Sequence, residues 1–234
     1  MTLTATPTPI YTIYLPMVLR IPCQERAVDV ALVVDVSSSM RRPAGDGGTK
    51  LDAVLRAARA FVEHFQPTEG RGRVAVVAFN NQAWLLQPLT SDRARLDAAL
   101  AGLPRLMAEG TRLDLGLAAG AAALAAVPPP RLRAMVFLTD GLPNRVPTPM
   151  AGGTQEDTVL VAAAAARAAG IRIQTVGYGR EDAPELVDRI LPWLLRAIAG
   201  DTGGYRETDD ASALAEVFRS LAAELGCVKE VQWP

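Results

Sequence analysis

Runs of apolar, β-branched residues alternate with segments of helical periodicity along most of this chain. Val28 to Val34 is an almost unbroken apolar run, typical of a strand that is buried on both faces of a sheet. After Thr49, apolar residues recur at intervals of three and four residues, which predicts an amphipathic helix that ends near Phe65. Further strands are predicted at Val74 to Phe79, Ala83 to Leu89, Ala134 to Leu138, Ile171 to Val176 and Tyr205 to Glu207.

Helical patterns separate most of these strands. Only a short turn, Asn80-Asn81, separates the second strand from the third, and so short a turn joins antiparallel neighbours. The other predicted helices are Asp92 to Leu100, Leu113 to Val127, Thr158 to Ala169, Leu186 to Ile198 with a disturbance at Pro192, and a last helix that starts at Asp210 or Ser212 and ends near Leu225.

This alternation of strands and helices predicts an α/β fold. Parallel strands need helical crossovers, which cover both faces of the sheet. We therefore expect a Rossmann-like three-layer α/β/α sandwich around a six-stranded, mostly parallel sheet. Ala83 to Leu89 is the one strand expected to be antiparallel, and such a strand ordinarily lies at an edge.

The length and composition favour one domain. Half of the 234 residues are hydrophobic, which is enough for a single large core. We place this domain at residues 23–227, after a Thr/Pro-rich linker and N-terminal flanking segment at 1–22 and before a C-terminal tail at 228–234. The best candidate for a membrane span, Ile10 to Ile21, is too short and contains Pro16, so we expect no direct membrane insertion of this chain. It is not a clean signal peptide either, because no positive charge precedes it.

The charge balance excludes some classes of partner. The formal net charge is -1, so there is no basic excess that would attract nucleic acid or anionic lipid. Of the 24 cationic residues only Lys50 and Lys229 are lysines. We interpret this preference for arginine, together with the many alanines, as a consequence of genomic base composition rather than of function.

Oxygen-bearing side chains gather in three loops where ligands bind in such folds, beyond the carboxyl ends of the strands. The first strand ends in an Asp-x-Ser-x-Ser pattern formed by Asp35, Ser37 and Ser39. Thr111 precedes the Ala-rich helix, and Asp140 follows the fourth strand in a Thr-Asp-Gly sequence. Two carboxylates and three hydroxyls, without sulfur or imidazole, suit a hard cation such as Mg²⁺, Mn²⁺ or Ca²⁺.

Each of these residues also has an ordinary structural explanation. Asp35 and Asp140 could form turns at strand ends, and Ser37 and Ser39 could cap the following helix. Caps and turns do not require all five residues at once, however. A site of this type that no longer binds metal is the further alternative, although no ligand residue is missing here.

In their order and spacing, these five residues resemble the metal-ion-dependent adhesion site of the von Willebrand factor type A family. The resemblance extends from about Val28 to Leu225. It implies that the serine and threonine hydroxyls are direct ligands, Thr111 only in the high-affinity arrangement, and that the two aspartates act largely through bound water. It also implies that an Asp or Glu of a protein partner completes the coordination of a bound Mg²⁺, or of Mn²⁺ or Ca²⁺. The residues expected at the partner-binding rim are Met40, Arg112, Gly141 and Leu142.

Two cysteines flank the expected domain. The resemblance to extracellular members of the family implies a disulfide between Cys23 and Cys227, which fits an oxidising compartment. Two inert thiols are the alternative. Together with the Thr/Pro segment, which is similar to the stalks of bacterial surface proteins, the cysteines indicate an extracellular or cell-surface location.

The leading hypothesis is therefore a metal-dependent adhesion or interaction module. The alternative is an intracellular scaffold that partners an AAA-type ATPase or a chelatase-like assembly. We expect no enzyme, because no Gly-rich turn follows the first strand and a P-loop is absent. The single histidine, His64, falls on a helix away from the metal loops, and we expect no His or Lys near the metal to act as a general base.

Overall fold

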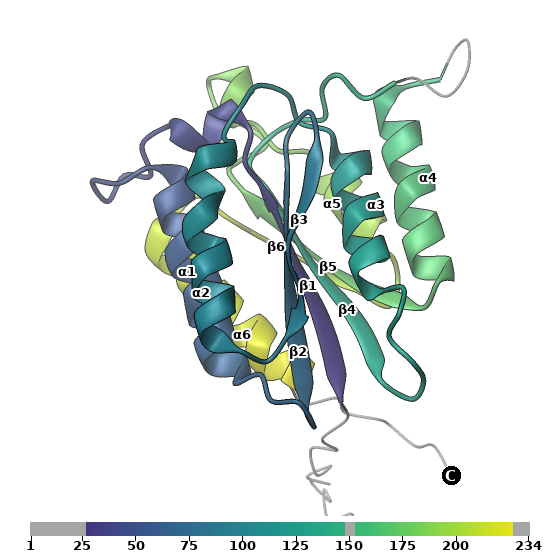
Figure 1. Ribbon diagram of the computed structural model, residues 1–234. Coiled ribbons are helices and arrows are strands. Elements are labelled where there is room, and N and C mark those ends of the chain that lie inside the picture. Colours follow the sequence, from purple (N-terminus) through teal and green to yellow (C-terminus); the bar gives the residue numbers. More distant parts are fainter. Residues whose placement is uncertain (1–26, 148–152, 227–234) are drawn as a thin grey trace, which may run out of the picture.

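The computed structural model describes residues 27–147 and 153–226, which form one α/β unit. Its sheet has the strand order β3-β2-β1-β4-β5-β6 (Figure 1). All neighbouring strands are parallel except β2 and β3, and β3 lies at an edge. This confirms the predicted fold. The strands are β1 (Val28–Asp35), β2 (Gly72–Phe79), β3 (Ala83–Thr90), β4 (Leu132–Thr139), β5 (Ile171–Tyr178) and β6 (Gly204–Thr208).

Helices cover both faces of the sheet (Figure 1). One face carries α1 (Lys50–Phe65), α2 (Arg93–Gly102) and α6 (Ala211–Gly226), and the other carries α3 (Leu113–Leu124), α4 (Gln155–Ala168) and α5 (Pro192–Ala199). Short 3₁₀ turns are η1 (Ser38–Arg41), η2 (Leu103–Leu106) and η3 (Leu186–Asp188).

Two apolar cores result, one on each face of the sheet. Along β1, Leu32 and Val34 belong to the core beneath α1 and α6, whereas Ala31 and Val33 belong to the core beneath α3 and α4. Successive side chains of a strand point to opposite faces, so a strand buried on both sides must be apolar throughout. This requirement explains the unbroken apolar run that predicted β1.

Several helix ends follow from capping residues. Thr49 accepts a hydrogen bond from the backbone N–H of Asp52, and the Asp52 carboxylate accepts one from the backbone N–H of Thr49, so a capping box starts α1. The predicted start of α4 was three residues too late. Thr154 caps this helix in the same way with Asp157, a spacing that sequence analysis overlooked.

The predicted helix from Leu186 to Ile198 was wrong in its first half. Only the 3₁₀ turn η3 forms there, and α5 begins at Pro192. Proline is well tolerated in the first helical turn, where its missing N–H would have no partner, so it marks a start rather than a disturbance. The predicted end of α3 was also too late, since the helix stops at Leu124.

Parts of the predicted organisation lie outside the described residues. These are the linker at 1–22, the tail at 228–234, and both Cys23 and Cys227. Within the described ranges, no helix has the length and apolar character needed to cross a membrane.

The topology defines where a ligand can approach. The chain continues from β1 to β2 on one side, whereas β4 lies on the other side of β1, so the strand order reverses between β1 and β4. Ligands of open α/β sheets bind beyond the carboxyl ends of the strands at such a reversal. The parallel register pairs Val34 with Leu138, which brings Asp35 next to Thr139 at that point.

Candidate metal centre

Asp35 ends β1 and is completely buried, with its carboxylate held in one orientation. One oxygen accepts a hydrogen bond of 2.7 Å from the backbone N–H of Ser37. The other accepts one of 2.6 Å from the hydroxyl of Thr139, the last residue of β4. Both hydrogen bonds come from uncharged groups, so no cation neutralises this carboxylate directly.

The two serines connect the loop after β1 to the loop after β4. Their hydroxyl oxygens, Oγ of Ser37 and Oγ of Ser39, lie 2.9 Å apart. The Ser39 hydroxyl donates to Asp140 Oδ1 over 2.7 Å. Although Ser37 occupies the N-cap position of η1, its side chain makes no capping hydrogen bond. The helix-capping explanation therefore does not account for Ser37, whose hydroxyl faces the other oxygen ligands.

Thr111 is held beside these groups by the third loop. Asn144 accepts from the backbone N–H of Thr111 over 3.0 Å and donates to its hydroxyl over 3.3 Å. The preceding Gly110 has φ +99°, and a Cβ there would lie 2.9 Å from Cβ of Asn81, so this tight turn requires glycine. A Cβ built on Gly141 would lie 4.0 Å from the hydroxyl oxygens of both Ser39 and Thr111. All three loops thus meet at one place.

The electrostatics of the centre favour a cation. Burial and the nearby Asp140 carboxylate raise the pKa of Asp35 to about 7, against the opposing effect of its hydrogen bonds from Thr139 and Ser37. Burial also raises the pKa of Asp140, although Lys50 and Ser39 lower it in part. Two buried carboxylates in one site disfavour ionisation unless positive charge is supplied.

The donor set fits a hard divalent cation. All five predicted side chains offer oxygen, and each is at most 7% exposed. Within the described ranges, no three His, Cys, Asp or Glu side chains are grouped so that they could hold a metal ion. A metal here would therefore depend on the hydroxyls as well as on the two carboxylates, which is the chemistry expected for Mg²⁺ rather than for a soft metal.

Our expectation that no lysine would lie near the site was wrong. Lys50, the first residue of α1, donates from Nζ to Asp140 Oδ2 over 3.0 Å and to Asp188 Oδ1 over 2.9 Å. Arg42 continues this network with 2.8 Å contacts to Asp188 and to Glu185. One signal was available in the sequence, because Lys50 is one of only two lysines in a chain whose other cationic residues are arginines. We had attributed it to base composition.

Thr139 and Asn144 were also missed as site residues. Thr139 belongs to the Thr-Asp-Gly sequence but received no role, and the parallel register of β1 and β4 is what brings it to Asp35. Asn144 holds Thr111 from a loop 33 residues away in sequence. No local pattern identified this contact.

A cavity of about 450 Å³ adjoins the centre. Two of the four expected rim residues, Gly141 and Leu142, line it. The cavity is lined by Ser37, Ser38, Ser39, Gly110, Thr111, Gly141, Leu142, Pro143, Asn144 and Leu186. The first residues of the loop after β4, from Gly141 to Asn144, belong to this lining, while residues 148–152 are outside the described ranges.

The other two predicted rim residues, Met40 and Arg112, do not line this cavity. Met40 is completely buried in the core beneath α1, because η1 turns its side chain inward. The guanidinium of Arg112 is held by the carboxylate of Asp114, at 2.8 and 2.6 Å, and does not line the cavity. The prediction of Met40 as a rim residue is therefore wrong, whereas that of Arg112, whose side chain is 19% exposed, stays a prediction. As expected, His64 lies away from the centre, in the last turn of α1.

The family comparison agrees with this geometry. Residues 30–142 match the family model of the von Willebrand factor type A domain. Over this stretch, just under half of the 234 residues, the chain is similar to the von Willebrand factor type A family. No curated protein matches the sequence.

Solved structures share the fold of this domain at low sequence identity. An aerotolerance-related membrane protein from Bacteroides fragilis NCTC 9343 is 20% identical, with a TM-score of 0.65 over 85% of this chain and 100% of that chain. The pilus adhesin SpaC from Lactobacillus rhamnosus GG is 19% identical, with a TM-score of 0.69 over 86% of this chain and 31% of that chain. The PilB minor pilin from Streptococcus sanguinis is 16% identical, with a TM-score of 0.66 over 87% of this chain and 62% of that chain. The two pilus proteins are therefore considerably longer than the part that this chain matches.

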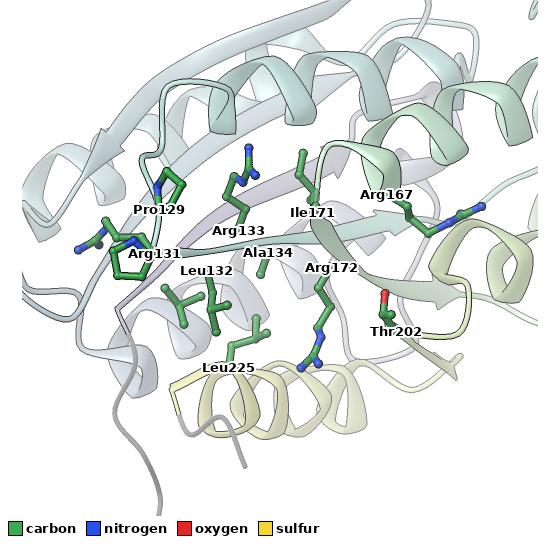
Figure 2. A pocket seen from close by; sticks show the side chains of 13 residues that line it. Pro129, Arg131, Leu132, Arg133, Ala134, Arg167, Ile171, Arg172, Thr202 and Leu225 are labelled. Carbon is green, nitrogen blue, oxygen red and sulfur yellow. The ribbon is translucent and has the colours of Figure 1, made fainter. Parts of the chain in front are cut away.

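A second cavity, of about 510 Å³, lies where β4 and β5 begin, at the opposite end of the strands of this domain (Figure 2). Figure 2 shows Arg133 and Arg172 extending to opposite sides of the sheet. Two other lining arginines already have structural partners: Arg131 binds Asp29, and Arg167 donates to the backbone carbonyls of Ala197 and Ile198. Both arginines therefore stabilise the fold at this end of the sheet.

Proposed function

We propose that this domain is a divalent-metal-dependent protein-binding module. It captures an acidic group of a protein partner through a Mg²⁺, Mn²⁺ or Ca²⁺ ion held at the carboxyl end of the sheet. The observation that supports this most strongly is the pair Asp35 and Asp140. Both carboxylates are fully buried and lie beside an open cavity, and among the described residues only Asp140 has a cationic contact, Lys50.

The side chains divide the work of holding the ion. The hydroxyls of Ser37, Ser39 and Thr111 solvate it without reducing its charge, and the two aspartates supply the negative charge, largely through bound water. Because the two aspartates act largely through water and the hydroxyls are neutral, a coordination position of the dication stays open to a further anion. A bound ion would thus supply an electrophilic position that a partner's carboxylate can occupy. The loop that contains Gly141 and Leu142 would lie beside that carboxylate.

Binding rather than catalysis suits this chemistry. The residues that line the cavity offer hydroxyl, amide and apolar groups, but no carboxylate, imidazole or amine that could act as a general base. Lys50 lies between two carboxylates, Asp140 and Asp188, and does not line this cavity. We therefore propose that the domain is not an enzyme.

An extracellular or bacterial cell-surface location is part of the proposal. It is supported by the Thr/Pro-rich segment, by the expected Cys23–Cys227 disulfide, and by the occurrence of the fold in pilus adhesins and a minor pilin. The disulfide would close a loop of about 200 residues and stabilise the domain by roughly 4 to 5 kcal/mol. Thiol titration of protein purified without reductant tests it, since two free thiols would exclude the bridge.

Metal binding is tested by calorimetric titration of Mn²⁺ into the wild type, Asp140→Ala, Thr111→Ala and Ser38→Ala. Asp140→Ala should weaken metal binding most, because it removes half of the negative charge. Thr111→Ala should retain metal binding but lose more of its affinity for an acidic probe, N-acetyl-aspartyl-glycine amide. Ser38 lines the cavity but is not a predicted ligand, so Ser38→Ala is the matched control and should behave as the wild type.

The same probe tests the dependence on metal. Its binding should be seen with Mg²⁺ and Mn²⁺ and should disappear in EDTA. Circular dichroism should show that each variant remains folded, because the substituted residues lie in loops at the end of the sheet. Equal binding of the probe in EDTA, or by folded Asp140→Ala, would show that acidic groups bind elsewhere and would overturn the proposal.

A further inference from the structure

The cavity beside the metal centre is larger than one carboxylate group requires. Its volume of about 450 Å³ lies in the range of sites that enclose a small molecule, about 300 to 1,000 Å³. The residues nearest the centre are hydroxyl-bearing, Ser37, Ser39 and Thr111. The same lining includes Leu142, Pro143 and Leu186, which present apolar groups. The cavity therefore joins an anion-accepting part to an apolar part.

Leu186 is unusual for its exposure at this position. It is 65% exposed, one of four large hydrophobic side chains that stand out in this way among the described residues. The others, Leu85, Val161 and Trp193, do not line this cavity. A ligand group that covers Leu186 removes apolar surface from water, which stabilises a complex by about 25 cal/mol per Å².

The position of Leu186 is set by the same charge network that reaches the metal centre. Asp188, two residues later in η3, contacts Lys50 at 2.9 Å and Arg42 at 2.8 Å. Lys50 in turn contacts Asp140 at 3.0 Å. A Cβ on Gly179 would lie 2.7 Å from the backbone oxygen of Asp188, so this close approach of η3 to the end of β5 requires glycine. The apolar side chain is thus held at a defined place relative to the ligand oxygens.

We propose that Leu186, Leu142 and Pro143 form an apolar subsite, which takes an apolar side chain adjacent to the acidic residue of the bound partner. The recognised segment is accordingly a peptide in which Asp or Glu is next to a residue of about the size of leucine. The inference rests on the proposed function, because the metal-bound carboxylate places the neighbouring side chain over Leu186. Continuity of the two parts within one cavity supports a single ligand for both.

The test uses four defined peptides with the Mg²⁺-loaded domain. They are N-acetyl-aspartyl-leucine amide and N-acetyl-leucyl-aspartate amide, each compared with its glycine counterpart. Affinities come from titrations followed by methyl resonances, among them those of Leu186 and Leu142. We expect at least one leucine peptide to bind about tenfold more tightly than its glycine counterpart and to shift the Leu186 methyl signals.

Leu186→Ser should abolish this preference while leaving Mn²⁺ affinity and the affinity for the glycine peptides unchanged. Val161→Ser is the matched control, because Val161 is 66% exposed but lies on α4, away from the cavity. This variant should keep the full preference for leucine. Both substitutions replace an exposed aliphatic side chain, so neither should disturb the core.

The outcomes separate this inference from the proposed function. Metal-dependent binding of all four peptides with equal affinity would overturn the apolar subsite and leave the metal-dependent function standing. A leucine preference that survives in EDTA would overturn the metal-dependent function, and with it the coupling of the two parts. Absence of binding by every peptide, despite tight Mn²⁺ binding, would overturn both. A preference retained in Leu186→Ser would also exclude the assigned subsite.

Discussion

Asp29 and Asp35 lie at opposite ends of the same strand, and both are completely buried. At the start of β1, Asp29 is contacted by the guanidinium groups of Arg73 and Arg131, in each case by two nitrogens. At the end of β1, Asp35 receives hydrogen bonds only from an amide and a hydroxyl. One strand therefore buries two carboxylates in opposite electrostatic surroundings.

The pKa values follow this contrast. Burial raises the pKa of Asp29, but hydrogen bonds from Arg131 and Arg73 outweigh burial and hold it below its ordinary value. For Asp35, burial and the neighbouring Asp140 dominate, and the pKa rises to about 7. Asp29 is thus already neutralised by the fold, whereas Asp35 lies where an added cation would be stabilised. This difference distinguishes a structural carboxylate from a candidate ligand.

The contrast predicts the largest loss of stability for Asp29→Asn. This change removes the charge that both arginines neutralise, and breaking a buried ion pair costs about 3 kcal/mol or more. We expect a loss at the low end of that range, because Arg73 and Arg131 are partly exposed and water can solvate them after the carboxylate is removed. Urea unfolding measures the loss, and Mn²⁺ titration should show unchanged metal affinity. A decrease in the free energy of unfolding of less than about 1 kcal/mol would mean that Asp29 stabilises the fold no more than Asp35 does.

Asp35→Asn should have the opposite profile. In EDTA its free energy of unfolding should equal or exceed that of the wild type, because the substitution removes a buried charge without a cationic partner. Wild type at a Mg²⁺ concentration of 100 times its Kd should gain about 2.7 kcal/mol, and the variant should lose this gain. Paired urea titrations with EDTA and with Mg²⁺ measure both quantities. Strong destabilisation of the metal-free variant would show that Asp35, too, serves the fold.

A smaller effect is expected at Lys50. Its ammonium group is paired with the carboxylate of Asp140 and repels a metal cation that binds to the same carboxylate. Lys50→Met should therefore raise Mn²⁺ affinity by about tenfold, or 1.4 kcal/mol. Arg56→Met is the control and should change little, because it removes an exposed cation of the same helix that pairs with Asp46 in the preceding loop. Weaker metal binding by Lys50→Met would instead show that the lysine orients Asp140 for the metal.

The smallest expected effect is a pH dependence at Asp29. Because its folded pKa is depressed below the ordinary value of 3.8, its stabilisation is present above that value and is lost as the pH falls through the folded pKa. The stability difference between wild type and Asp29→Asn should be constant from pH 7 to pH 5 and should shrink towards pH 3. Unfolding free energies at these three pH values measure it. A difference that persists unchanged at pH 3 would point to packing rather than charge.

Much of the fold and of the candidate centre could be predicted from the sequence. A strand that is buried on both faces must be apolar throughout, so β1, β2, β4 and β5 were recognisable as apolar runs in the sequence. The five candidate ligand residues stood in short patterns at predicted strand and helix ends, where the parallel topology brings loops together. The rim was predicted less well, because neighbours in sequence were assumed to share an orientation. Met40 follows Ser39 directly, yet η1 turns its side chain into the core.

The sequence by itself determined which oxygen-bearing residues gather in the candidate centre and at which end of the sheet they lie, because periodicity and strand direction are local properties. The tertiary structure alone decided which buried carboxylate is neutralised. Asp29 meets arginines that are 44 and 102 residues away in sequence, and Asp140 meets Lys50 across 90 residues. The pKa of a buried group depends on burial and on the charges within a few ångströms. Those neighbours are chosen by packing, so the difference between Asp29 and Asp35 exists only in the folded chain.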